Sequence, residues 1–187
     1  MAIYNVAETT NVSGKCFSMV YGADIENGSV VKMGDIITDK REEYAAGIPA
    51  KGDKVYLVAN PAWSYKNGTI EQNEDNYINV ANKPFRVYGL IAEHDDRFGV
   101  MDYGITPVVS GTDELPPAVG DYIGVDGTTV KLKNFGATIP ADADNRGFLG
   151  KIVDIDNYGC VIPVGTAGTI STVTKMVVIK VIKNENV

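Results

Sequence analysis

The sequence contains a single histidine, His94, which stands among acidic residues in the segment Glu93-His94-Asp95-Asp96. Neighbouring carboxylates stabilise a protonated imidazole, so His94 with Asp95 or Asp96 could supply a general base for hydrolysis. A single imidazole excludes metal sites that require two or three histidines. Charged segments between strands are usually solvated loops, and we favour that interpretation here, so we predict no catalytic residue.

A second acidic segment, Asp154-Ile155-Asp156-Asn157-Tyr158-Gly159, has two aspartates and a glycine at the spacing of a helix-flanked calcium loop. The match fails further on, because Tyr158 takes the fifth position and Gly165 takes the twelfth, which requires a bidentate glutamate. We therefore predict no metal-binding residue. A calcium site built from scattered loop oxygens is the alternative.

Neither the cysteines nor the glycine-rich segment indicates a reactive site. Cys16 and Cys160 lie far apart in the sequence, which favours two buried thiols in a reducing compartment, and neither has a nucleophile signature. The segment Gly165-Thr166-Ala167-Gly168-Thr169 lacks the lysine and the following helix of a phosphate-binding loop. We therefore predict no cofactor.

The composition restricts the class of partner. Of the 187 residues, 44% are hydrophobic and 22% are charged, which is typical of a folded globular protein. The formal net charge of -7 would repel a phosphate backbone, so we predict no nucleic-acid partner. No signal peptide is visible, and the longest apolar run, Met176-Val177-Val178-Ile179, is far shorter than a membrane-spanning helix, so we predict no membrane partner.

Short runs rich in β-branched and aromatic residues, bounded by turn residues, recur along the chain and predict strands. The predicted strands are 16–21, 29–33, 54–59, 85–91, 98–101, 122–125, 129–132, 148–155, 160–163 and 175–182. Pairs such as Asn27-Gly28 and Asp126-Gly127 favour tight hairpin turns between them. Only residues 39–46 could form a short helix. We predict an all-β fold with a barrel or sandwich architecture.

Two segments of the chain resemble each other. Pro49-Ala50-Lys51-Gly52-Asp53 precedes one predicted strand, and Pro117-Ala118-Val119-Gly120-Asp121 precedes another. Two similar small β units, or two halves of one barrel, would produce this repeat, and coincidence among common turn residues is the alternative. We place an N-terminal arm at 1–15, a first β domain at 16–106 and a second β domain at 107–187.

Two segments carry residues that suit contacts with a partner. Ile3, Tyr4 and Val6 precede the repeated pattern and could form an extended arm that adds to a neighbour's sheet, although an ordinary edge strand is the simpler interpretation. Trp63 and Tyr65 lie in a polar loop, where aromatic side chains anchor protein or sugar contacts, unless Trp63 folds back over the end of a barrel. We predict these five residues as the partner-binding residues.

Four segments resemble a known family of viral proteins: Met1-Ala2-Ile3-Tyr4-Asn5-Val6-Ala7-Glu8-Thr9, Asn60-Pro61-Ala62-Trp63, Lys83-Pro84-Phe85-Arg86-Val87-Tyr88-Gly89-Leu90 and Asp95-Asp96-Arg97-Phe98-Gly99-Val100. They are similar to segments of the capsid decoration proteins, also called cement or auxiliary capsid proteins, of tailed bacteriophages. The resemblance covers mainly residues 1–101. The second half of the chain shares only a general β character with this family.

The resemblance implies a non-enzymatic, β-rich structural protein that binds the outer surface of the assembled capsid and stabilises it. Its partner would be the major capsid protein, a homo-oligomer would be compatible with this role, and the chain would be made in the host bacterial cytoplasm and reside on the virion. Weak contacts would suffice, because many copies reinforce one another on a repeating shell. The alternative is a carbohydrate- or receptor-binding β module of a virion fibre or baseplate, with Trp63 and Tyr65 as its contacts.

Overall fold

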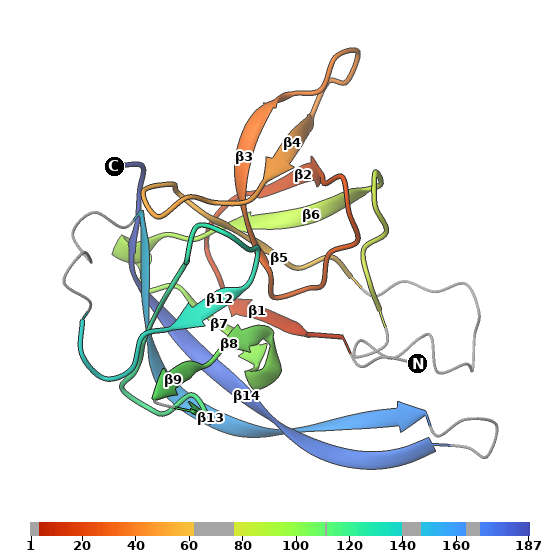
Figure 1. Cartoon of the computed structure of the whole chain (residues 1–187). Coiled ribbons are helices and arrows are strands. Elements are labelled where there is room, and N and C mark those ends of the chain that lie inside the picture. Colours follow the sequence, from red (N-terminus) through yellow and green to blue (C-terminus); the bar gives the residue numbers. More distant parts are fainter. Residues whose placement is uncertain (1–3, 62–76, 111, 140–146, 164–168) are drawn as a thin grey trace.

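The computed structural model describes residues 4–61, 77–110, 112–139, 147–163 and 169–187, and for 159–163 and 169–172 it describes the backbone alone. The predicted all-β fold is confirmed. Within the described ranges there are strands and short 3-10 helices, including η3 (Ala92–His94) and η4 (Asp102–Gly104), but no α-helix. The strands form a small closed barrel and a curled sheet that lies against it (Figure 1).

The barrel consists of β2 (Cys16–Val20), β3 (Val30–Ile36), β4 (Glu43–Gly47), β5 (Tyr56–Val58) and β6 (Pro84–Gly89), in the order β2-β4-β3-β5-β6. Antiparallel pairing of β6 with β2 closes it. Alternate residues of β6 are buried, as a strand with one face on a core requires. The barrel interior is filled by six buried side chains: Met19, Ile25, Val31, Val58, Phe85 and Val87.

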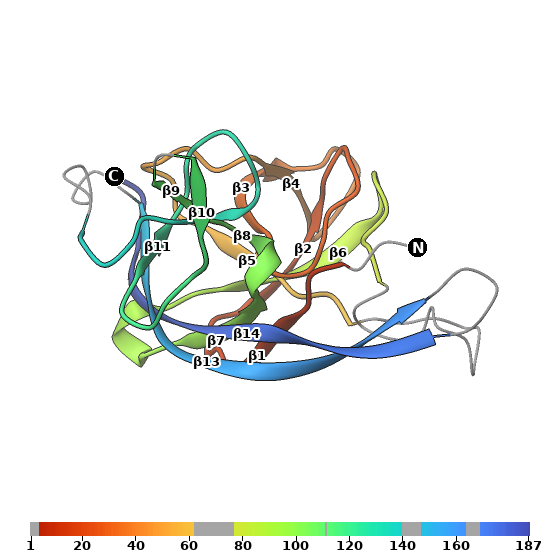
Figure 2. The same cartoon turned by 60° about the horizontal axis from the view of Figure 1, so that its bottom comes forward.

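The curled sheet has seven strands in the order β1-β7-β14-β13-β11-β12-β8. Their bounds are β1 (Ala7–Asn11), β7 (Arg97–Met101), β8 (Ile105–Thr106), β11 (Tyr122–Gly124), β12 (Leu132–Asn134), β13 (Phe148–Pro163) and β14 (Thr169–Asn184). A separate two-stranded hairpin is formed by β9 (Val108–Ser110) and β10 (Asp113–Leu115). Figure 2 shows β13 and β14 running together along one side of the molecule.

The barrel and the sheet share one hydrophobic core. Val30 and Leu57 of the barrel belong to the same buried cluster as Phe98, Phe148 and Ile179 of the sheet. In addition, β7 lies before the predicted boundary at residues 106 and 107 but pairs with β14, which lies after it. Strands from both predicted domains therefore contribute to one sheet and one core.

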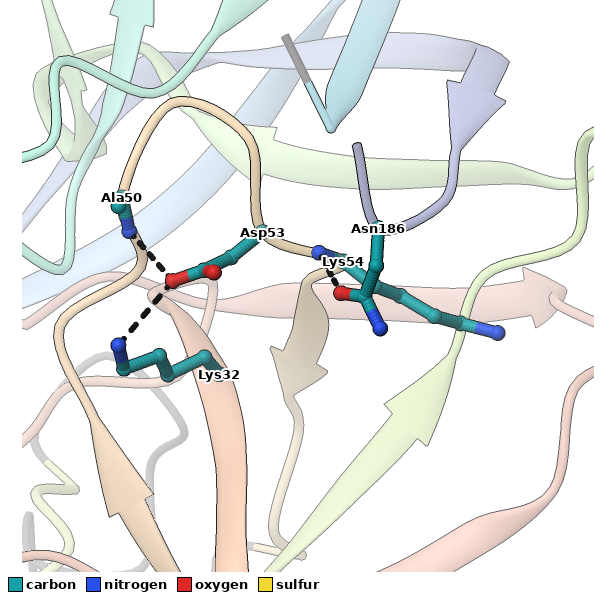
Figure 3. A network of polar contacts seen from close by, with 5 residues as sticks. All are labelled: Lys32, Ala50, Asp53, Lys54 and Asn186. Carbon is teal, nitrogen blue, oxygen red and sulfur yellow. Dashed lines mark hydrogen bonds and ion pairs between the residues drawn. The ribbon is translucent and has the colours of Figure 1, made fainter.

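The two turns that resemble each other in sequence have the same hydrogen bonds. The Asp53 carboxylate accepts from the amide of Ala50 at 2.8 Å (Figure 3). The Asp53 amide in turn donates to the Ala50 carbonyl at 3.1 Å. Asp121 and Ala118 repeat both bonds, each at 3.1 Å. The first turn also binds Lys32, whose ammonium lies 3.2 Å from the Asp53 carboxylate. The repeated sequence thus builds a repeated local structure.

Three local predictions are wrong. The predicted helix at 39–46 is absent, because residues 43–47 form strand β4 between β2 and β3. The predicted break between strands 148–155 and 160–163 is absent too, since both belong to the single strand β13. The Asp126-Gly127 hairpin is wider than a two-residue turn: Ile123 faces Asn134, while the Asp126 carboxylate accepts from the amides of Thr128 and Thr129.

Candidate functional site

The acidic segment around His94 lines an open cleft. The cleft has a volume of about 480 Å³ and is formed by residues 10–13, at the end of β1 and just after it, and by residues 94–97, which lead from η3 into β7. The Ser13 hydroxyl lies 2.9 Å from Nδ1 of His94 and donates to Oδ1 of Asp96 at 2.5 Å. Serine, histidine and aspartate therefore meet here, although the sequence separates Ser13 from the other two by more than eighty residues.

The order of contacts differs from that of a hydrolytic relay. In such a relay the imidazole accepts the serine proton, and the aspartate holds the other ring nitrogen. Here Asp96 accepts the Ser13 hydroxyl directly, and His94 contacts the same hydroxyl through Nδ1. The carboxylate is therefore placed on the serine rather than on the far side of the imidazole.

Asp96 holds two distant segments together. Its side chain is almost fully buried, with the residue 1% exposed. Besides the Ser13 hydroxyl, Oδ1 accepts the Ser13 amide at 3.0 Å, and Oδ2 accepts the Ile91 amide at 2.8 Å. The Asp96 carbonyl also accepts the amide of Val181 in β14 at 2.9 Å. These bonds make Asp96 a structural anchor between the connection from β1 to β2, the turn before β7, and the last strand.

The neighbouring Asp95 faces solvent and two cations. Its φ of 60° places it in the left-handed region, which turns the chain from η3 into β7. Its carboxylate contacts the Lys180 ammonium at 2.5 Å and the Arg97 guanidinium at 3.5 Å. The hydrogen bond from Lys180 lowers the pKa of Asp95 below its usual range. Asp95 therefore stays ionised and serves as a charge partner for β7 and β14.

The other candidate sites do not assemble around a ligand. Asp154 and Asp156 lie within the uninterrupted strand β13, whereas a calcium loop requires a bend that brings several oxygens together. Within the described ranges, no group of three or more His, Cys, Asp or Glu residues is placed to hold a metal ion. The predicted burial of Cys16 is wrong, because Cys16 is exposed on β2, where it pairs with Tyr88 of β6.

The described part of the N-terminal segment packs on its own chain. Val6 is 2% exposed and belongs to a buried cluster with Met101 and Met176. Asn5 is also buried, and its side-chain oxygen accepts the Met101 amide at 2.9 Å. The following strand β1 pairs with β7 of the same chain. Val6 is thus buried in the protein's own core, while β1 pairs with β7 on one side only and is the outermost strand of the curled sheet. The role of this segment in partner binding stays a prediction.

Of the remaining predicted partner-binding residues, only Tyr4 can be placed. It is half-buried, and its carbonyl accepts the hydroxyl of Tyr103 at 2.5 Å. Ile3, Trp63 and Tyr65 lie outside the described residues. Their role in partner binding stays a prediction.

An exposed apolar surface that the sequence did not single out lies beside η4. A cleft of about 380 Å³ is lined by Tyr103, Ile105, three prolines (Pro107, Pro116 and Pro117), and the acidic Asp102 and Glu114. Tyr103 is 38% exposed, and Val109, which lies directly opposite Glu114 in the β9–β10 hairpin, is 64% exposed. Side chains opposite each other on two paired strands share one face of the hairpin. We call Tyr103, Pro107, Val109, Pro116 and Pro117 the apolar patch.

Asp102 and Glu114 give the apolar patch an acidic border. Asp102 is fixed in place, because its carboxylate accepts from the Tyr103 amide at 2.9 Å and from the Thr174 hydroxyl at 3.0 Å. Apolar surface that stays exposed in a folded chain commonly marks a site of protein contact. The chemistry of this surface suits a partner that offers an apolar side chain flanked by a basic one.

Comparisons with known proteins do not assign the chain to a family. Within the described ranges, no helix is long and apolar enough to cross a membrane. The chain matches no family model, and comparison with curated proteins and with solved structures found no significant match.

Proposed function

We propose that this chain is a non-enzymatic structural protein that binds the outer surface of an assembled tailed-bacteriophage capsid, through the major capsid protein, and stabilises it. The observation that carries the proposal is the apolar patch, an exposed surface with an acidic border on a rigid β scaffold. The sequence resemblance described above supplies the identity of the partner.

The apolar patch would supply one contact in an interface that is repeated over the capsid surface. Exposed apolar side chains such as Val109 would be withdrawn from water on docking, at roughly 25 cal/mol for each Å² of apolar surface buried. A single cleft of this size supports only modest affinity. On a shell that presents the same site many times, modest contacts produce stable coating because neighbouring copies reinforce one another.

The test is binding to empty capsids assembled from the cognate major capsid protein. Co-sedimentation should show saturable coating by the native chain, and coated particles should resist thermal or mechanical disruption better than bare ones. Val109→Asp, which places a charge on the apolar patch, should weaken coating by at least about tenfold, since a buried unpaired charge is costly. Ile36→Asp is the matched control, because Ile36 is a 51% exposed aliphatic residue at the far end of β3, and it should coat as the native chain does.

Each outcome is decisive. Absence of capsid binding by the native chain would overturn the proposal, and equal coating by both variants would remove the apolar patch from it. Capsid binding that is lost in a Trp63→Ala and Tyr65→Ala double variant would instead assign the contact to that loop. Binding to a glycan array without affinity for capsids would favour the receptor-binding alternative.

A further inference from the structure

The distal parts of β13 and β14 form a two-stranded arm. The two strands pair over their full length, from Phe148 opposite Asn184 to Pro163 opposite Thr169. However, β7 covers β14 only from Met176 to Lys180, and β11 covers β13 only at Gly150 and Lys151. We call residues 157–163 and 169–175 the arm, which is separate from the predicted N-terminal arm at 1–15. Figures 1 and 2 both show it projecting beyond β1 and β7.

The arm is also distinguished by its lack of charge. No charged residue occurs from Asn157 to Thr174, although 22% of the chain is charged, and Asp156 and Lys175 stand immediately on either side of this stretch. Its strands are rich in β-branched residues, including Val161, Ile162, Ile170 and Val173. Charged side chains on edge strands normally prevent one sheet from adding to another. Beyond Lys175 at its base, this arm lacks that protection.

The register shows which backbone groups face the open edge of β14. The Val181 amide donates to the Asp96 carbonyl, on the side of the sheet occupied by β7. Backbone groups alternate between the two edges along a strand, and β14 pairs with β7 without interruption down to Met176. The amides and carbonyls of Thr169, Ser171 and Val173 therefore face the same edge, past the end of β7. Lys175 lies where the chain leaves β7 for η4, and there the Asp102 carboxylate accepts the hydroxyl of the adjacent Thr174 at 3.0 Å. Among the strands that the structure describes, none pairs with that edge.

The two edges of the arm differ in how well they could accept another strand. The outer edge of β13 contains Gly159 and ends at Pro163, and both residue types disfavour strand addition. Residues 169–175 of β14, Thr-Ile-Ser-Thr-Val-Thr-Lys, contain neither, and no bulge interrupts their pairing with β13. The edge of β14 is thus the one suited to pairing.

We propose that the open edge of β14 pairs with the same edge of a second copy of this chain, antiparallel about Thr172. This register places Ser171 opposite Val173 of the second copy and Val173 opposite its Ser171, so that the outward-facing backbone groups of both residues meet and no like charges oppose each other. Thr172 would face its own counterpart at the two-fold axis. The sequence of this edge is therefore complementary to itself.

The distribution of charge allows a second copy to approach through the arm. Each chain carries a net charge of -7, so the bodies of two copies repel each other. The arm contains no acidic residue and only one charged residue, Lys175, and it projects away from the body, so pairing through it keeps the acidic bodies apart. Such a pair forms a closed two-fold contact. Each copy's β14 edge is then occupied by the other copy, so no third copy can add there.

A proline substitution separates edge pairing from folding of the arm. In Val173→Pro the lost amide is one that faces the open edge, so pairing with β13 is retained. Val173 is 64% exposed, and Val173→Thr is the matched control that keeps the amide. In sedimentation velocity over a concentration series, the native chain and Val173→Thr should show the same reversible dimerisation, and Val173→Pro should associate at least about tenfold more weakly. A native chain that stays monomeric throughout, or a Val173→Pro variant that dimerises normally, would overturn the proposal.

A cysteine at the proposed axis tests the register. Thr172→Cys should be made together with Cys16→Ser and Cys160→Ser, since Cys160 lies opposite Thr172 within the hairpin. Facing residues of a non-hydrogen-bonded antiparallel pair have Cα atoms about 4.5 Å apart, which a disulfide can span. Thr172→Cys should therefore form a covalent dimer under mild oxidation. Ile170→Cys in the same background should not, because it would face Thr174 of the second copy. Crosslinking of both variants, or of Ile170→Cys alone, would exclude this register. No capsid is needed, so failure here is distinct from failure of the proposed function.

Discussion

The amide and the hydroxyl of Ser13 both donate to one carboxylate oxygen of Asp96, at 3.0 and 2.5 Å. This double contact joins the connection after β1 to the start of β7. It also explains why an arrangement of serine, histidine and aspartate exists in a cleft without the order that hydrolysis requires. The aspartate is committed to structure, and this leads to the first prediction.

Asp96→Ala should be strongly destabilising, and His94→Ala should not. Loss of the Asp96 carboxylate leaves the amides of Ser13 and Ile91 without their partner, which should lower the free energy of unfolding by about 2–4 kcal/mol. Ser13→Ala removes only the hydroxyl and should cost about 1 kcal/mol. His94 is exposed, so His94→Ala should change stability by less than about 0.5 kcal/mol. Urea denaturation of the three variants checks the ranking, and a costly His94→Ala would contradict the structural role given to Asp96.

The ion pair between Asp95 and Lys180 should make stability depend on pH at the acidic end. The folded-state pKa of Asp95 is lowered by the Lys180 hydrogen bond, so the pair stabilises the fold above the unfolded pKa near 3.9. This contribution is lost as the pH falls through the folded pKa. Lys180→Met should raise the Asp95 pKa in an NMR titration. Added salt should reduce the difference in Asp95 pKa between the native chain and Lys180→Met. Lys40→Met, which removes an ion pair with Glu43 instead, should leave the Asp95 pKa unchanged.

Gly104 lies against the buried Asn5, and a side chain there should be destabilising. A Cβ atom at Gly104 would collide with the side-chain amide of Asn5, whose oxygen is held by the Met101 amide. Gly104→Ala should therefore lower the free energy of unfolding by about 1–3 kcal/mol, measured by thermal or urea denaturation. Gly22→Ala is the control, because a Cβ atom at Gly22 meets no other atom within 4 Å. Equal stability of the two variants would contradict this packing.

The two repeated turns should differ in their sensitivity to substitution. Asp121 is 8% exposed and accepts from the buried Asn134 amide at 2.9 Å in addition to the Ala118 amide. Asp53 is more accessible and binds Lys32 at the surface. Asp121→Ala should cost about 2–3 kcal/mol and Asp53→Ala about 1 kcal/mol, because solvent can replace the lost partner only at Asp53. Urea denaturation of both variants distinguishes this ranking from equal or reversed costs.

Sequence patterns predicted the all-β class because strand-forming runs and turn pairs are local features. Most predicted strands are present, with shifted ends, and the turns at Asp53 and Asp121 have the same geometry because the same residue types occur at the same spacing. Prediction failed where long-range pairing decides the structure. Residues 43–47 become a strand because β2 and β3 flank them, and this effect of tertiary context cannot be read from residues 39–46 alone.

The candidate sites were harder to predict for the same reason. Nothing local connects Ser13 with Asp96, and the lining of the apolar patch comes from η4 and from the β9–β10 hairpin, whose approach depends on the fold. The cluster of prolines in 107–117 was a visible signal, but it indicated a boundary rather than a surface. The absence of charge from 157 to 174 was also visible in the sequence. Its meaning depends on β7 ending at Met101, beyond which no strand in the described part of the chain pairs with the edge of β14.

The central position of β14 in the curled sheet has a consequence for folding kinetics. This strand lies between β7 and β13 and follows every other strand in chain order. The apolar side chains of β7 that pack beside β14 therefore stay exposed to water until β14 has been synthesised. Pairing of β14 with β7 must then close a loop of more than seventy residues. Proteins dominated by such distant contacts fold in milliseconds to seconds rather than microseconds. During that interval the exposed apolar surface and unpaired strand edges make the chain prone to aggregation.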